Sequence, residues 1–127
     1  MALETRFSVF VENKVGKLSE LCAAISEANI NIRGLSTVIE ADWAIVGLIV
    51  DDENKTKDVL HKRNLKFGVS TVLTAGMDNK PGQIAKITKK LSEQHIDIVY
   101  ASLTAEGEHC LLVLMTTDNK KANEILG

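Results

Sequence analysis

Two short polar segments contain the residues whose types and spacing could bind a small charged ligand. Residues 12–18 read ENKVGKL and residues 78–84 read DNKPGQI, so each has Asn-Lys, then a Gly, then an aliphatic residue. Each stands between a short apolar run and a segment with helical spacing. A helix N-terminus presents unpaired N–H groups, and a Gly there lets an anion approach the backbone. With an Asn beside it as donor and acceptor, such a loop could bind a zwitterionic amino acid.

The same segments could instead be plain turns between a strand and a helix. Gly permits close backbone packing, and Pro81 costs little at a helix start because its missing N–H would be unpaired there. Duplication preserves turns as well as binding sites, so both interpretations stay open. The spacing is too short for a P-loop and lacks its glycine-rich run, so we expect no nucleotide phosphate here.

Both segments belong to a repeat that covers nearly the whole chain. A shift of 66 residues, the offset from Asn13 to Asn79, aligns residues 5–61 with residues 71–127. Identical residues recur along this alignment, and most other apolar positions are exchanged conservatively. The repeat predicts two small units, residues 1–70 and residues 71–127. The second unit is too short to hold its own last strand, so that strand is either absent or replaced by another segment.

Each unit begins with the same expected elements. Residues 6–11 have the composition of a strand, and the polar loop follows. The next apolar residues have the i, i+3, i+4, i+7 spacing of a helix that lies on a sheet: Leu18, Leu21, Cys22 and Ile25. Asn29 ends this helix, and His95 stands at the equivalent position of the second unit.

The remaining elements complete the order β-α-β-β-α-β. We expect strands at 30–38 and 44–50, strands at 96–104 and 110–116, and hairpin turns at 40–42 and 106–108. Asp51 or Asp52, and Asp118, can cap a second helix, and residues 66–70 can supply a last strand in the first unit. This order predicts an α+β, ferredoxin-like sandwich with an antiparallel sheet and the helices on one face.

The loop, a helix of about three turns and the next strand's opening NINI or HIDI together resemble the ACT domain, a small amino-acid-binding regulatory module. The resemblance covers both units. The whole chain is similar to stand-alone tandem ACT proteins, which carry no attached enzyme. It implies two ACT-type units joined edge to edge in a continuous sheet, with a ligand at their interface. We expect the units to pair through their second strands and first helices, within one chain or between two, and we expect a homodimer.

The resemblance also implies which residues contact the ligand. In regulatory units such as that of phosphoglycerate dehydrogenase, the loop Asn and an Asn at the start of the second strand contact the effector. Val11 and Met77 stand where that family has a histidine, which weakens the case for serine as the ligand. Carried to this chain, one composite site combines Asn13, Gly16, Lys17 and Leu18 with Asp97 and Ile98. The other combines Asn79, Gly82, Gln83 and Ile84 with Asn31 and Ile32.

The two expected sites differ in charge. Asp97 offers a full negative charge to a ligand ammonium, whereas Asn31 offers only an amide. The Asn13/Asp97 site is therefore expected to bind more tightly. The alternative is that Asp97 is a solvated residue with no role in binding.

No residue pattern indicates catalysis, a metal or a cofactor. The three histidines are scattered without a zinc-type spacing, and neither a Ser-His-Asp nor a paired-carboxylate arrangement can be argued. Cys22 and Cys110 are interpreted as small apolar residues of the interior. The basic residues between 55 and 66 are interpreted as one solvated helix face, and Trp43 as a packing residue at the end of a strand.

Composition argues against two other kinds of partner. The net charge of −2 and the aromatic content of 4% disfavour nucleic-acid binding. The longest apolar run, residues 43–50, is too short to span a bilayer, and the N-terminal residues do not resemble a secretory signal. We therefore expect a cytoplasmic, non-enzymatic, allosteric module that binds an amino acid and acts on itself or on a partner enzyme. The alternative is an oligomerisation or interaction scaffold of the same fold that binds no ligand.

Overall fold

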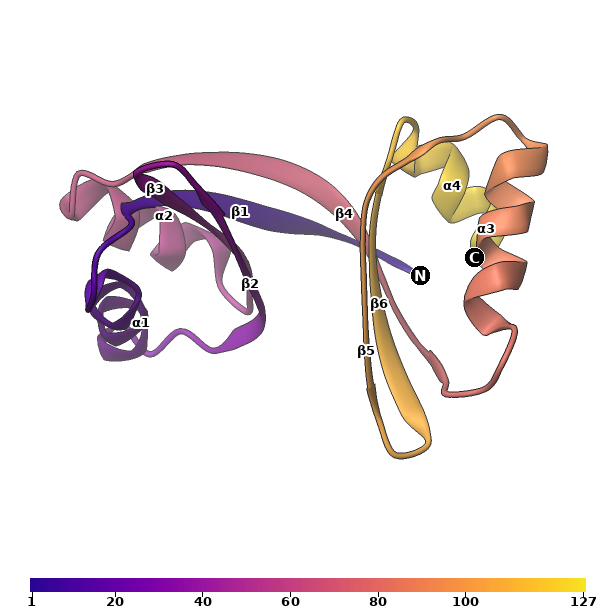
Figure 1. Ribbon diagram of the computed structural model, residues 1–127, viewed down its shortest axis with the longest axis horizontal. Helices are drawn as coiled ribbons and strands as arrows, with labels where there is room; N and C mark the ends of the chain where they lie inside the picture. The colour runs from indigo at the N-terminus through magenta and orange to yellow at the C-terminus, as the bar shows by residue number, and fades with distance from the viewer. The chain divides into compact units, whose positions relative to one another are not determined.

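The computed structural model describes all residues 1–127 and confirms the α+β, ferredoxin-like fold with two tandem units (Figure 1). The elements are β1 (Ala2–Glu12), α1 (Lys17–Glu27), β2 (Ile32–Glu40), β3 (Trp43–Val50), α2 (Glu53–Lys62), β4 (Lys66–Asp78), α3 (Gln83–Glu93), β5 (Ile98–Glu106), β6 (His109–Thr116) and α4 (Asn119–Leu126). The chain divides into two compact units. We call Thr5–Ser70 the first unit, and Thr71–Gly127 together with Met1–Glu4 the second unit.

In the first unit the strands lie in the order β2-β3-β1, followed by the start of β4. β1 pairs antiparallel with β3 from Phe7 opposite Leu48 to Glu12 opposite Trp43. β2 pairs with the other edge of β3 and is the edge strand of this unit. The predicted first strand was too short, because β1 begins at Ala2, where the sequence lacks a clear apolar alternation.

In the second unit the order is β5-β6-β4, and the start of β1 follows β4. Met1–Glu4 thus take the place beside β4 that the last strand of a ferredoxin-like unit would occupy. The Thr74 hydroxyl of β4 donates a hydrogen bond to the Glu4 carboxylate, which ties the two segments together. Met1–Glu4 therefore replace the last strand that the second repeat lacks.

Each unit has its own apolar core between the sheet and two helices that cover one sheet face (Figure 1). In the first unit the alternate residues Phe7, Val9 and Val11 of β1 point to this face, and Leu21 and Ile25 of α1 pack on them. The main buried residues of the second unit come from β4, α3, β6 and α4: Leu73, Leu91, Leu112, Leu114 and Ala122. Of the predicted α1 stripe, Leu21 and Ile25 are buried as their spacing predicts, whereas Leu18 is exposed and Cys22 only partly buried.

The helix boundaries follow from residues that the sequence singles out. Asp52 accepts a hydrogen bond from the Lys55 N–H and caps α2, and Asp118 caps α4 in the same way. Asn29 has φ +59° just after α1, and the N–H of the next residue, Ile30, bonds back to the Ile25 carbonyl. His95 repeats this left-handed turn after α3, so both helices end where the sequence predicts.

The second strands, β2 and β5, are edge strands with one neighbour each. The expectation that second strands pair with each other within one chain is therefore wrong, because β3 and β6 are their only neighbours in the chain. Both strands carry exposed apolar side chains, including Leu35 and Ile39 of β2 and Leu103 of β5. None of the helices is long and apolar enough to cross a membrane.

Candidate functional site

The loops before α1 and α3 form helix N-termini without a capping side chain. Gly16 precedes α1 with φ +89°, and Gly82 precedes α3 with φ +87°. Such left-handed values are accessible to Gly at little cost and are unfavourable for other residues. A Cβ built on either Gly would have no atom within 4 Å, so open space lies beside the backbone at both positions.

Several N–H groups at these helix starts have no partner. The first bond of the α1 ladder runs from the Glu20 N–H to the Gly16 carbonyl, 2.9 Å, and the Lys17 N–H turns back to Lys14. The N–H groups of Leu18 and Ser19 are then left over, as expected for the first turn of an uncapped helix. The start of α3 repeats the pattern, with the Lys86 N–H bonded to the Gly82 carbonyl at 3.0 Å. Each unit thus presents backbone donors that suit an anionic group.

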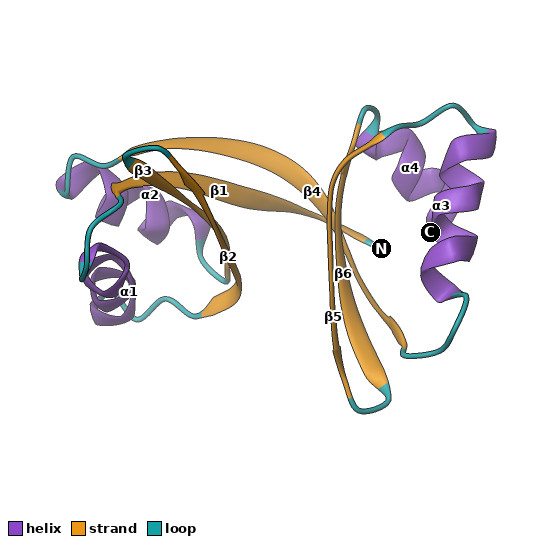
Figure 2. Cartoon of the chain, in the orientation of Figure 1, coloured by secondary structure: helices purple, strands orange, loops and turns teal.

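The loop asparagines donate hydrogen bonds to the neighbouring hairpin turns. Figure 2 colours these loops and turns teal. The Asn13 side-chain amide donates to the Ala41 carbonyl at 3.4 Å, and the Asn79 amide donates to the Gly107 carbonyl at 3.0 Å. The main-chain N–H of Asn13 also bonds to the Asp42 carbonyl. These bonds use one of the two side-chain N–H donors of each Asn for structure, so its second N–H and its carbonyl oxygen are left for a ligand, and the oxygen can accept a hydrogen bond.

The acid and the lysine of each loop form an ion pair. Glu12 lies 2.8 Å from the Lys14 ammonium, and Asp78 lies 3.8 Å from that of Lys80. The hydrogen bond from Lys14, with its charge, lowers the pKa of the exposed Glu12 carboxyl, and the same bond raises the pKa of Lys14. The repeated acid-Asn-Lys pattern therefore has a structural explanation: the pair and the Asn hold the loop, and the Gly turns it into the helix.

Asn31 and Asp97 lie at the starts of the second strands, where their backbones bond to the ends of β3 and β6. The Asn31 N–H donates to the Asp51 carboxylate at 2.9 Å, and the Asp97 N–H donates to the Thr117 hydroxyl at 3.1 Å. In the first unit, α1 with its 11 residues separates Asn31 from Asn13 by roughly 16 Å at 1.5 Å per residue. Neither unit by itself brings its loop residues and its strand-start residues into one site.

The other predicted site residues have mixed environments. Ile32, Ile84 and Ile98 are partly buried against the cores of their units, and Leu18 is more exposed. Lys17 forms an ion pair with Glu20, 3.5 Å apart on the same helix turn. Gln83 is the first residue of α3. The three isoleucines thus contribute to the folded core whether or not a ligand is bound.

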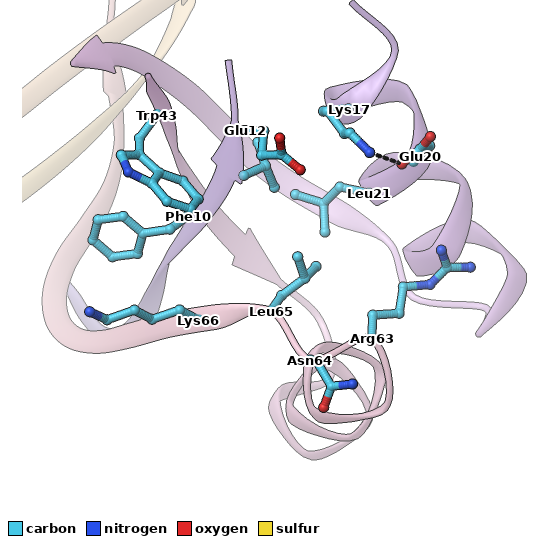
Figure 3. Close-up of a pocket in the computed structure, with 11 residues that line it drawn as sticks. Phe10, Glu12, Lys17, Glu20, Leu21, Trp43, Arg63, Asn64, Leu65 and Lys66 are labelled. Carbon is cyan, nitrogen blue, oxygen red and sulfur yellow. Dashed lines mark hydrogen bonds and ion pairs between the residues drawn. The ribbon is translucent and has the colours of Figure 1, made fainter. Parts of the chain in front are cut away.

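A pocket of about 440 Å³ opens in the first unit, where the ends of β1 and α2 meet the starts of α1, β3 and β4 (Figure 3). We call it the β1–β4 pocket, and its lining residues are Phe10, Val11, Glu12, Lys17, Glu20, Leu21, Trp43, Arg63, Asn64, Leu65 and Lys66. Of these, only Lys17 was among the predicted site residues. In the sequence, the two aromatic residues Phe10 and Trp43 could have indicated this pocket, because the chain has few aromatic residues. In the structure, Trp43 is half exposed.

The structure contains no group of three or more His, Cys, Asp or Glu side chains placed to hold a metal ion. Cys110 is buried with its thiol near the Met77 carbonyl, as its apolar strand predicts. Cys22 is only partly buried on α1. Both cysteines are free thiols.

Comparisons with known proteins agree with this architecture. The family model described as "ACT domain pair" matches residues 1–126. Protein BT0572 from Bacteroides thetaiotaomicron has a crystal structure with a TM-score of 0.92 and 28% identity, covering 98% of this chain and 86% of that one. No curated protein matches.

Two further structures share the fold at low sequence identity. The ligand-free regulatory subunit of aspartate kinase from Thermus thermophilus has a TM-score of 0.69 and 9% identity, covering 98% of this chain and 89% of its own. Escherichia coli aspartokinase III in complex with aspartate and ADP has a TM-score of 0.65 and 14% identity, covering 98% of this chain and 31% of its own. With the family match over nearly its whole length, the chain belongs to the ACT domain family as an ACT domain pair, a regulatory ligand-binding module.

Proposed function

We propose that the chain is a non-catalytic, allosteric module that binds an amino acid between two copies of itself. The observation that supports this most is the uncapped helix N-terminus in each unit, with a left-handed Gly and unpaired N–H groups. These donors suit a ligand carboxylate. The carbonyl oxygen of Asn13 or Asn79 beside them suits the ligand ammonium.

The edge strands supply the reason for two copies. β2 and β5 each lack a second neighbour and expose apolar side chains such as Leu35, Val38 and Val99. A second copy that pairs β2 with β5 would cover both edges in a homodimer. The same pairing would place the loop of one copy against the strand start of the other. It would therefore complete the two composite sites, Asn13 with Asp97 and Asn79 with Asn31.

A thermal-shift panel of the proteinogenic amino acids tests the binding part of this proposal. Aspartate belongs in the panel in particular, because the similar aspartokinase III structure was determined with aspartate. A ligand at a hundredfold excess over its Kd stabilises the folded state by about 2.7 kcal/mol, which is easily measured as a shift in Tm. Light scattering at several protein concentrations tests the homodimer. A strict monomer at high concentration would contradict the composite sites.

The second candidate function is a ligand-free scaffold with the same dimer. One specific observation favours it: the side-chain amides of both loop asparagines donate hydrogen bonds to hairpin turns. These bonds give the loop a structural role without any ligand. A dimer that shows no shift with any amino acid would support the scaffold and contradict the sensor. In either case we propose a regulatory partner and a cytoplasmic location, with which the two free thiols are compatible.

A further inference from the structure

The sheet of the first unit has its helices on one face and an apolar patch on the opposite face. Because Val9, Val11 and Ala44 point into the core, the alternate residues of β1 and β3 point to the opposite face. Val38 of β2 lies directly opposite Ile45 in the strand pairing, so it belongs to the same face. We call this set the Trp43 patch, and its members are Phe10, Val38, Trp43 and Ile45.

The Trp43 patch is open to solvent. The Trp43 side chain is 50% exposed and that of Val38 is 60% exposed, while Phe10 and Ile45 are partly buried. Figure 3 shows the Phe10 and Trp43 rings beside each other, on the other side of the strands from Leu21. Contiguous exposed apolar residues mark protein contacts, and tryptophan is enriched at the centres of such contacts.

The equivalent face of the second unit lacks such a patch. At the positions equivalent to the two aromatic residues and Val38, the 66-residue repeat has one small residue and two polar ones. These are Gly76, Thr104 and His109. The second unit forms the same strand pairs without the patch, so the fold does not require these apolar residues.

Opposite charges flank the Trp43 patch on its two sides. Glu40 lies directly opposite Trp43 in the strand pairing, on the edge strand β2. On the other side, the Lys66 ammonium of β4 lies 5.8 Å from the centre of the Phe10 ring. Both charged side chains are exposed, and neither forms an ion pair within the chain. Glu12, which also lies opposite Trp43, already has a lysine of its own loop at 2.8 Å.

We propose that the Trp43 patch is covered by the same patch of a second copy of this chain. A twofold axis parallel to the strands, between β3 and β1, places β2 of one copy over β4 of the other. Glu40 of each copy then faces Lys66 of the other, and the Phe10, Trp43 and Ile45 side chains meet in the middle. Three strand spacings, roughly 14 Å, separate β2 from β4 in both sheets, so the two ion pairs form together. With an acid on one side and a base on the other, the patch is complementary to itself under this symmetry.

This contact does not depend on the edge pairing of the proposed homodimer. Trp43 lies on β3, an inner strand, so the pairing of β2 with β5 leaves its ring exposed. If both contacts form, two edge-paired dimers join into a tetramer. If edge pairing fails, the Trp43 patch alone gives a dimer. The two contacts can therefore be measured separately.

Trp43 allows a direct test because it is the only tryptophan of the chain. Acrylamide quenching of its fluorescence is measured on the full chain from about 1 µM to about 1 mM, with light scattering on the same samples. We expect the quenching constant of the associated protein to be at least about twofold below that of the Lys66→Glu variant, because the second copy shields the ring. Equal quenching of the two proteins at the highest concentration would overturn the proposal. A wild-type dimer with freely quenched Trp43 would support edge pairing and contradict the patch contact.

Charge reversal tests which residues face each other. Glu40→Lys and Lys66→Glu each bring like charges together twice in a twofold dimer, so either change should weaken association at least about tenfold. The double variant exchanges the two charges and should associate within about threefold of the wild type. Asp58→Lys is the control, because it makes the same change of charge at an exposed position of α2, on the other face of the sheet. Single variants that associate as the wild type does, or a double variant as weak as the single ones, would overturn the proposal.

Discussion

The guanidinium of Arg6 lies across the backbone of Gly47 and bridges strands β1 and β2 of the first unit. It donates to the Ser8 hydroxyl and to the Ser36 hydroxyl, both at 3.2 Å, so it reaches from β1 over β3 to β2. A Cβ on residue 47 would stand 2.6 Å from the Arg6 Cζ atom, which is closer than real contacts allow. The absence of a side chain at Gly47 is what gives Arg6 this path.

We expect Gly47→Ala to lower the free energy of unfolding by about 1–2 kcal/mol, because Arg6 must move and lose bonds worth about 1 kcal/mol each. Urea unfolding measures the change. Gly68→Ala in β4 is the matched control, since a Cβ there meets no atom within 4 Å. In an Arg6→Ala background, Gly47→Ala should cost no more than the control. A persistent cost in that background would show that the contact with Arg6 is not the cause.

Replacing the loop glycines should separate their role in the turn from their role in binding. Gly16→Ala and Gly82→Ala each put a Cβ on a residue with positive φ, at a cost of about 1 kcal/mol. Gly107→Ala is the control, because Gly107 also has positive φ, +60°, but lies in a hairpin turn. We expect similar losses of stability from all three changes and a loss of amino-acid affinity from the first two alone. Normal binding by both loop variants would place the ligand elsewhere.

The two composite sites should differ in affinity. Asp97→Asn removes the charge that we propose for the ligand ammonium, and hydrogen bonds to charged groups contribute roughly 1.5–3 kcal/mol against about 1 for neutral ones. Calorimetric titration of the wild type should therefore resolve a tighter and a weaker site, and the tighter one should weaken in the variant. Asn31→Asp is the reciprocal change and should strengthen the other site. Two identical sites in the wild type would contradict this asymmetry.

The Glu12–Lys14 pair should stabilise the fold slightly at neutral pH and lose this effect in acid. Because the pKa of Glu12 is lowered in the folded state, its contribution is complete above the unfolded value of about 4.5 and is lost as the pH falls below it. Both side chains of the pair are exposed, so the contribution is small and screened by salt. Urea midpoints of wild type and Glu12→Gln, measured from about pH 3 to 7, should converge at the acid end. Lys14→Met should remove the same dependence, and a gap that widens toward acid would refute it.

Much of the fold could be predicted from the sequence because its signals are local. The spacing of Leu18, Leu21 and Ile25 predicts α1, and Asp52 and Asn29 mark where helices begin and end. The 66-residue repeat then carries the same elements into the second unit. The partner of the Met1–Glu4 segment could not be predicted in this way, because its pairing with β4 joins residues about 70 positions apart and leaves no periodic pattern.

The sites were predicted less completely than the fold. The repeated acid-Asn-Lys pattern identified the two helix N-termini, but the donation of Asn13 to the Ala41 carbonyl became visible only in the structure. The β1–β4 pocket was missed because Phe10, Trp43 and Arg63 are far apart in the sequence. Arg63 and Lys66 were interpreted as part of a solvated face, and charge alone does not show which lysine or arginine lies beside an aromatic ring.

The position of Met1–Glu4 also sets an order of events during synthesis on the ribosome. The first unit consists of Thr5–Ser70, so it can close once residue 70 has emerged. Met1–Glu4 must then wait for Thr71–Gly127, which are translated after the first unit. Until β4 is complete they form a short exposed strand end, with polar Glu4 among them to discourage pairing with a neighbouring nascent chain. Met1–Glu4 are thus translated before the first unit but find their native partner only after it.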